Sequence, residues 1–184
     1  MQGGNTVTKQ NKSAKKSKTH DDAAGKPKLY TLEVFLLSGQ YTEEFAKKNP
    51  VVSRTIQIRG DQTLEDLHEA IFEAFDRFDP HMYEFQFGKR PMDPKGPRYV
   101  LPEAVEGDMD EENPPAGTVE ATLDSLELTT KSQFGYWFDF GDDWWHQINV
   151  VSIDAEAPSG RFPKLTKRIG KSPPQYIPEG EEDE

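Results

Sequence analysis

The sequence predicts a single α+β domain with a mainly antiparallel sheet, one main helix and a β-grasp-like order of elements. Two observations support this fold class. Five segments rich in β-forming residues lie between residues 29 and 153, and one segment with apolar residues at helical spacing lies among them. The order is strand, strand, helix, strand, insertion and hairpin, which favours antiparallel neighbours. The likeness to a β-grasp fold is one of element order and carries no information about function.

The first two strands are expected at residues 29–37 and 51–59. The first is apolar on both faces, as a central strand would be. In the second, apolar residues alternate with polar ones, and Arg54 interrupts the apolar row. Two interpretations stay open: the Arg54 side chain extends along the core to reach solvent, or the strand begins at Thr55.

The main helix is expected at residues 61–78. Thr63 and Asp66 approximate a capping box, and Asp79-Pro80 ends the helix because proline disfavours helical geometry in the residue before it. One face is apolar, with Leu64, Leu67, Ile71, Ala74, Phe75 and Phe78. The opposite face is polar, with Glu65, Asp66, Glu69, Glu73, Asp76 and Arg77.

The remaining elements follow an acidic, proline-rich insertion. Residues 81–87 alternate as a strand does, and residues 88–121 contain six prolines, so we expect a mobile insertion in which Tyr99-Val100-Leu101 could dock. Residues 122–126 predict a second, short helix. A hairpin of residues 134–140 and 144–153 then completes the domain of residues 29–153.

The two ends of the chain differ in charge from the domain. Residues 1–28 are predicted to be a disordered basic tail with seven lysines, and residues 179–184 an acidic tail. Residues 154–178 are expected to form a C-terminal strap, and their segment 161–171 holds five basic residues and no acid, although the net charge of the chain is −11. The basic segments could contact phosphates, which the acidic body would repel.

The hairpin is the most distinctive segment, because it combines aromatic residues with an acidic turn. A two-residue Gly141-Asp142 turn would pair Trp137 with His146 and Asp139 with Trp144. These four residues would share one face, where Asp139 and His146 form a hydrogen-bonded pair. Trp145 would lie on the opposite face, beside Phe138 and Tyr136, and the strap is expected to cover that face.

A divalent-metal site is the alternative use of the same region. His68, His81 and His146 could point into the space between helix and sheet, where Asp139 or Asp142 would complete a site for zinc, manganese or iron. Without a short-spaced ligand pair, these histidines more simply complete the edge of a core, and no cofactor is predicted. The chain also has no cysteine, phosphate-binding loop, nucleotide fingerprint or serine-nucleophile motif.

The sequence Asp139-Phe140-Gly141-Asp142-Asp143-Trp144 resembles the signature of the plasmid ORF-three-like family, also labelled insertion-element passenger or TnpR-like proteins. The resemblance covers about residues 29–177, including the segments 63–68, 81–85 and 168–176. It implies a fold and, through the family label, a link to mobile genetic elements. It implies no established activity.

These observations predict a cytoplasmic, non-enzymatic binding or accessory module, with a metal-dependent hydrolase as the alternative. The partner is expected to be a protein or a nucleic acid, with no membrane contact, and a monomer is favoured. The expected contact surface consists of Trp137, Trp144, Trp145, Asp139, Asp142, His146, Lys164, Lys167 and Arg168. The metal ligands of the alternative are His68, His81, His146 and Asp139.

Overall fold

A computed structural model describes residues 1, 25–90, 92–93, 95–107 and 112–177. Most of the predicted tail 1–28, all of the predicted tail 179–184 and part of the insertion lie outside the described residues. The structure confirms the α+β class with a single, mainly antiparallel sheet. No helix in the described part of the chain has the length and apolar character needed to cross a membrane.

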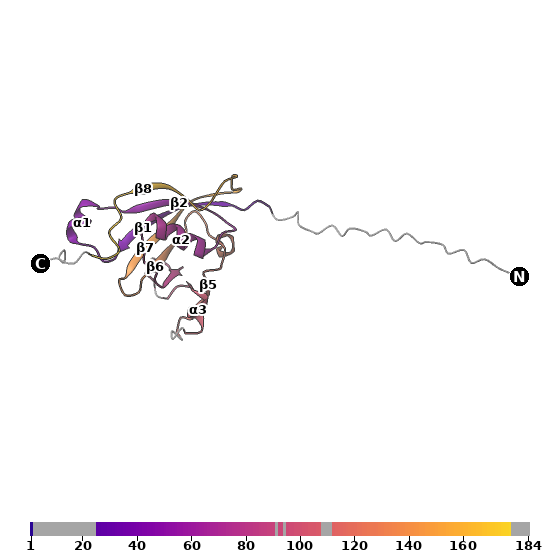
Figure 1. Ribbon diagram of the computed structural model, residues 1–184, viewed down its shortest axis with the longest axis horizontal. Coiled ribbons are helices and arrows are strands. Elements are labelled where there is room, and N and C mark those ends of the chain that lie inside the picture. Colours follow the sequence, from indigo (N-terminus) through magenta and orange to yellow (C-terminus); the bar gives the residue numbers. More distant parts are fainter. Residues whose placement is uncertain (2–24, 91, 94, 108–111, 178–184) are drawn as a thin grey trace.

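Eight strands of the described residues form one sheet in the order β5-β4-β3-β6-β7-β1-β2-β8 (Figure 1). The strands are β1 (Leu29–Ser38), β2 (Ser53–Arg59), β3 (Tyr83–Gln86), β4 (Arg98–Val100), β5 (Gly117–Thr118), β6 (Gln133–Phe138), β7 (Trp144–Asp154) and β8 (Lys164–Ile169). All neighbours pair antiparallel except β4 and β5. The predicted order strand, strand, helix, strand is present, but β6 and β7 separate β3 from β1 in the sheet.

The helices are α1 (Glu43–Lys48), α2 (Leu64–Ala74), α3 (Pro102–Val105) and a 3₁₀ turn, η1 (Leu123–Leu126). Helix α2 lies across the sheet (Figure 1) and packs its apolar side chains against one face, which we call the helix face. Its start confirms the capping box: Thr63 Oγ1 accepts a hydrogen bond from Asp66 N at 3.1 Å, and Asp66 Oδ2 accepts one from Thr63 N at 2.8 Å.

The end of α2 differs from the prediction. The helix stops at Ala74 because Asp76 takes a left-handed conformation, with φ of 57°. The backbone N–H of Arg77 then bonds to Phe72 O at 3.0 Å, and Asp76 N bonds to Glu73 O at 3.1 Å, which is the Schellman arrangement. The chain therefore leaves the helical path before Pro80 can act. Phe78, expected in the core, is 70% exposed.

Residues 88–121, expected as an insertion, supply two strands at one edge of the sheet. Tyr99 pairs with Phe85 and so docks as predicted, and β5 extends this edge with a parallel pair. Glu84 and Arg98 are both buried there, with Arg98 Nε 3.5 Å from Glu84 Oε2. Strands β4 and β5 therefore form the end of the sheet, and β3 separates them from the hairpin strand β6.

The strap behaves differently from the expectation that it covers the hairpin. Part of it forms β8, which pairs with β2 at the opposite edge of the sheet. Beyond β8, the side chain of Gln175 is buried and accepts hydrogen bonds from the backbone N–H groups of Phe78 and Asp79, at 3.0 and 3.1 Å. The described part of the strap therefore packs on its own domain and fixes the end of α2, and its strand β8 lies at the sheet edge away from the hairpin.

Candidate functional site

The tip of the β6–β7 hairpin is a five-residue loop instead of the predicted two-residue turn. Asp139 and Asp143 both adopt left-handed conformations, with φ of 55° and 53°, which aspartate tolerates better than most residues. The Asp139 carboxylate accepts hydrogen bonds from the N–H groups of Gly141 and Asp142, at 3.2 and 3.3 Å. These bonds within the loop stabilise the longer turn, and they change the register of the whole hairpin.

The observed register corrects the predicted faces of the hairpin. Trp137 pairs with Trp145, and Tyr136 pairs with His146, each one residue away from the expected partner. Because directly paired residues share a face, Trp144 and His146 point toward α2 while Trp137 and Trp145 point away from it. Tyr136 and Phe138 accompany His146, not Trp145. The expected contact surface is thus divided between the two sides of the sheet.

The face that points away from α2, here called the open face, carries an aromatic cluster. The rings of Trp137 and Trp145 stack with centroids 4.7 Å apart and planes at 9°, and Phe140 lies 4.3 Å from Trp137. Trp137 Nε1 donates a hydrogen bond to Asp143 Oδ1 at 3.0 Å. Within the described residues, the helices contact the other face, so these rings lie outside the helix-covered core.

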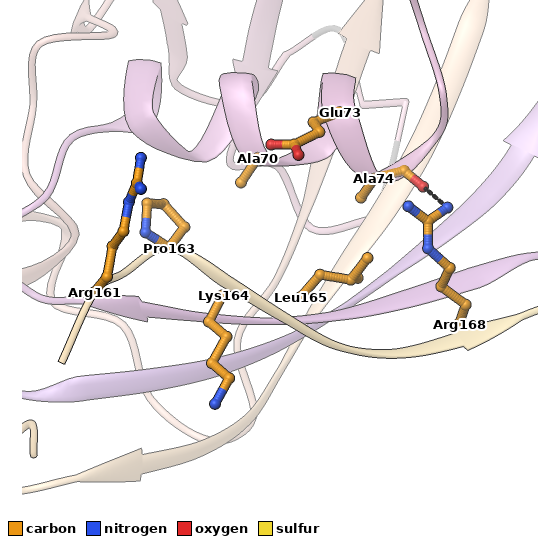
Figure 2. Close-up of a pocket in the computed structure, with 8 residues that line it drawn as sticks. All are labelled: Ala70, Glu73, Ala74, Arg161, Pro163, Lys164, Leu165 and Arg168. Atoms are coloured by element: carbon orange, nitrogen blue, oxygen red, sulfur yellow. Dashed lines mark hydrogen bonds between the residues drawn. The ribbon is translucent and has the colours of Figure 1, made fainter.

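The basic residues of β8 are also divided between the faces. Lys164 and Lys167 pair with Gln57 and Thr55 on the open face, whereas Arg168 pairs with Arg54 on the helix face. Figure 2 shows Lys164 directed away from α2 and Arg168 directed toward the Ala74 carbonyl, to which it donates a hydrogen bond at 2.8 Å. Arg168 also contacts Asp76, so its guanidinium stabilises the end of α2.

A groove of about 500 Å³ separates α2 from β8 (Figure 2). Its lining combines the apolar residues Ala70, Ala74, Pro163 and Leu165 with the charged residues Glu73, Arg161, Lys164 and Arg168. An acidic helix side and a basic strand side therefore face each other. The lining holds three basic side chains and one acidic side chain, so positive charge prevails in the groove.

The three histidines proposed as metal ligands do not meet at one point. His68 Nδ1 lies 2.7 Å from the Tyr136 hydroxyl, and the His68 ring stacks on Tyr83 with centroids 3.6 Å apart. His146 lies on another side of Tyr136, with ring centroids 5.2 Å apart. Across the part of the chain that the structure describes, no three His, Asp or Glu side chains are arranged to hold a metal ion.

His81 belongs to a polar cluster at the rim of the domain. Its Nε2 lies 2.9 Å from the Tyr176 hydroxyl, 3.5 Å from Asp139 Oδ2 and 3.6 Å from Asp79 Oδ2. Asp139 is therefore the neighbour of His81, and the expected Asp139–His146 hydrogen bond is wrong. Both His146 ring nitrogens are buried without a hydrogen-bond partner.

Arg77 is a site residue that the sequence pattern missed. It was expected on the solvent face of the helix, but its side chain is buried and its guanidinium carbon lies 3.6 Å from the centre of the Trp144 ring. Burial lowers the pKa of Arg77 to about 10, which leaves it charged at neutral pH. The only local signal was Asp76 near the helix end, since aspartate can adopt the left-handed turn that redirects the next residue inward.

The two inward histidines should make the fold sensitive to acid. Burial lowers the pKa of His68 to about 4, and burial followed by the charge of Arg77 lowers the pKa of His146 to about 3. Both folded values lie below the unfolded value of about 6.5, so the unfolded chain takes up protons first and stability is lost as pH falls below 6.5. We expect each histidine to cost about 2 kcal/mol between pH 7 and pH 5.

Urea unfolding at several pH values between 5 and 7 measures this loss. Replacing His146 with Leu should reduce the acid-dependent part by about half, because His68 alone then remains of the pair. An unchanged dependence on pH in the His146→Leu variant would show that His146 is not a neutral buried group.

Comparisons with known proteins place the chain among proteins without an assigned activity. The model of the plasmid pRiA4b ORF-3-like protein family matches residues 42–179. The uncharacterized protein y4hQ of Sinorhizobium fredii (strain NBRC 101917 / NGR234) is 28% identical over 133 residues, which are 70% of this chain and 60% of that protein. The chain thus spans about three fifths of the length of this curated relative.

A solved structure shows the same fold. It is the crystal structure of the protein of unknown function MM3350 from Methanosarcina mazei Go1, with a TM-score of 0.62 at 23% identity. The match covers 82% of this chain and 75% of that chain, and at this identity it shows the fold alone. The family match spans most of the chain and contains the hairpin signature. The chain therefore belongs to the plasmid pRiA4b ORF-3-like protein family.

Proposed function

We propose that this protein is a non-enzymatic binding module that docks a partner protein on the open face of its sheet. The observation that carries the proposal is the aromatic cluster outside the helix-covered core, in which Phe140 is exposed, Trp137 is half-buried, and the buried Trp145 stacks against Trp137. Tryptophan is enriched among the residues that supply most of the binding energy in protein interfaces. The Trp137 indole is already held by its bond to Asp143, so little side-chain freedom would be lost on binding.

A hollow that includes Gln147, two residues along β7 from Trp145, supports a protein partner. Its volume is about 320 Å³, and it lies between the start of β2 and the strands β1 and β7. Phe35, Leu37 and Val51 line it together with the amide side chains of Gln147 and Asn149. An apolar side chain of a partner would fit such a hollow, and the amides could hydrogen-bond to the partner's backbone.

The distribution of charge favours a protein over a nucleic acid. Strand pairing places four bases and three acids on the open face, namely Arg59, Arg98, Lys164 and Lys167 with Glu33, Glu84 and Asp154, and the chain as a whole has a net charge of −11. Binding a phosphate backbone gains most of its affinity from several neighbouring cations. Four bases that share this face with three acids supply little of this affinity, whereas an aromatic anchor surrounded by polar groups is typical of a protein interface.

The first experiment identifies the partner and then measures its affinity. A photo-crosslinking amino acid at Phe140 is used in cells that express the protein, with the same group at Glu69 on the polar side of α2 as control. The protein captured only from Phe140 is purified and titrated by calorimetry. A labelled single-stranded oligonucleotide is titrated in parallel.

We expect Trp137→Ala to weaken binding to the purified partner about 30-fold or more, the effect of losing a hot-spot residue. Because Trp137 is only partly buried, its loss should lower the free energy of unfolding by no more than about 1.5 kcal/mol, the contribution of an aromatic pair. Lys164→Glu and Lys167→Glu should change the affinity by less than about threefold. Equal crosslinking from Glu69, unchanged affinity in Trp137→Ala, or oligonucleotide binding abolished by the lysine variants would each contradict the proposal.

A further inference from the structure

We infer that Arg77, Trp144 and His146 form the inner wall of a buried site that binds one carboxylate group. The site lies on the helix face of the sheet, between the end of α2 and the hairpin, so it is separate from the open face and independent of the proposed function. The three side chains are 7%, 0% and 1% exposed.

Most polar atoms of these residues have no partner within the described residues. Arg77 Nε, Nη1 and Nη2 and Trp144 Nε1 are buried without a hydrogen bond, and the buried ring nitrogens of His146, which also make none, have the backbone groups of Tyr136 and Trp144 close by. Buried polar groups are hydrogen-bonded in the great majority of cases, and an unpaired buried charge is especially unfavourable. In contrast, the neighbouring Tyr136 hydroxyl already contacts His68, and His81 contacts Tyr176. The unpaired groups therefore gather at one place in an otherwise satisfied region.

The donors of the wall match a carboxylate in number. The guanidinium carbon lies 3.6 Å from the centre of the Trp144 ring, and none of the three guanidinium nitrogens makes a hydrogen bond, so the group can donate two parallel hydrogen bonds to one carboxylate. Trp144 Nε1 adds a donor, and a neutral His146 adds another. A carboxylate has about four lone-pair positions, so it could accept from all of these groups at once.

Charge decides between a carboxylate and a larger anion. One carboxylate neutralises Arg77, whereas a phosphate dianion would leave a buried negative charge. Asp139 and Asp142 add to this discrimination, because both act electrostatically on Arg77 from the hairpin loop. Burial and the neighbouring Asp139 raise the pKa of Asp142, and the repulsion from these two aspartates opposes a phosphate dianion about twice as strongly as a carboxylate.

The carboxylate could belong to a free small acid or to a polypeptide, and the chemistry of recognition is the same for both. The hairpin loop of residues 139–143 directly precedes Trp144 in the chain, and Gly141 at its tip is exposed. Acetate tests the first source. A tetrapeptide with a free C-terminal carboxylate, compared with its amidated form, tests the second.

Nuclear magnetic resonance of the indole N–H groups provides a direct readout in the intact protein. The chain has three tryptophans and so three indole signals, which Trp144→Phe and Trp137→Phe assign. We expect acetate to shift the Trp144 signal saturably, with a dissociation constant on the order of 1–10 mM, while the Trp137 and Trp145 signals stay in place. Chloride and phosphate at the same ionic strength should not reproduce this shift.

Two arginine variants test the assignment. Arg77→Met should weaken acetate binding at least tenfold, and Arg77→Lys should weaken it as well, since lysine lacks the two-pronged geometry. The control Arg161→Met removes an exposed arginine in the groove of Figure 2 and should leave binding unchanged. Each variant is first shown to be folded by its near-ultraviolet circular dichroism.

The outcomes separate the two sources and decide the inference. Tighter binding of the free-ended peptide than of acetate, lost on amidation, assigns the site to a polypeptide carboxylate, and binding of acetate alone assigns it to a small acid. Absence of a saturable Trp144 shift with every carboxylate probe, an equal shift with phosphate, or binding retained in folded Arg77→Lys and Arg77→Met would overturn the inference. The open-face experiment has a different readout, so failure of one does not affect the other.

Discussion

Replacing Arg54 with alanine is expected to lower the free energy of unfolding by about 3–5 kcal/mol, the usual cost of breaking a buried charged network. Arg54 is 1% exposed and lies over the Phe75 ring, with its guanidinium carbon 4.8 Å from the ring centre. Its Nε donates to Ala74 O at 2.8 Å, and Nη1 donates to Ile169 O at 2.9 Å. One side chain thus joins β2, α2 and β8.

The size of the effect follows from what the substitution leaves behind. Besides the two carbonyl groups, Ser53 O accepts from Nη1 at 2.7 Å, and Ser172 Oγ lies 2.7 Å from Nη2. Alanine would remove a donor from each of these buried or half-buried acceptors, although Ala74 O still accepts from Arg168, and it would also create a cavity beside Phe75. Urea unfolding of both proteins, compared at equal slope, measures the difference.

Arg168→Ala is the matched control for Arg54→Ala. Arg168 shares the Ala74 carbonyl as an acceptor, but it is exposed and its remaining contact is with the exposed Asp76. Its loss should cost about 1 kcal/mol or less, as for other surface ion pairs. A loss below about 1 kcal/mol for Arg54→Ala, or equal losses for the two variants, would show that Arg54 does not hold the three elements together.

Arg54 also shows which structural features the local sequence pattern can predict and which it cannot. The alternation in residues 51–59 located the strand, and the two interpretations of Arg54 followed from treating an arginine in an apolar row as an exception. The structure gives a third outcome: the strand begins at Ser53, and the guanidinium stays inside because carbonyl groups at the ends of α2 and β8 accept its hydrogen bonds. Those acceptors lie 20 and 115 residues away in the chain, beyond any local pattern.

The hairpin register shows a different limit. The alternation of its strands was correct, and so was the placement of Trp144 and Trp145 on opposite faces. The length of the turn decided which residues pair and which face each pair occupies, because a shift of one residue in register changes the partner of every strand residue. The left-handed backbone of Asp139 and Asp143 made the longer loop possible, and two aspartates in sequence cannot by themselves reveal it. The fold class was thus predictable, whereas the composition of each face was not.

Gly39 provides the second large effect, because it lies directly against the largest buried side chain of the core. A Cβ atom added at Gly39 would lie 2.0 Å from Cε3 of Trp144, far inside van der Waals contact. Trp144 is fully buried and has Arg77 against its ring, so the indole has little room to move aside. We expect Gly39→Ala to lower the free energy of unfolding by about 2–3 kcal/mol, within the range known for overpacked cores.

Gly25→Ala is the control for the Gly39 substitution, since nothing lies within 4 Å of a Cβ atom added at Gly25. It should change stability by less than about 0.5 kcal/mol. Urea unfolding gives the stabilities, and the near-ultraviolet circular dichroism of the tryptophans reports whether Trp144 has moved. Because Trp144 also forms part of the inferred carboxylate site, a displaced indole in Gly39→Ala should shift the Trp144 indole resonance in the absence of ligand. Wild-type stability with an unchanged spectrum would mean that Gly39 and Trp144 are not in contact in solution, and the packing of the hairpin against this end of β1 would then be wrong.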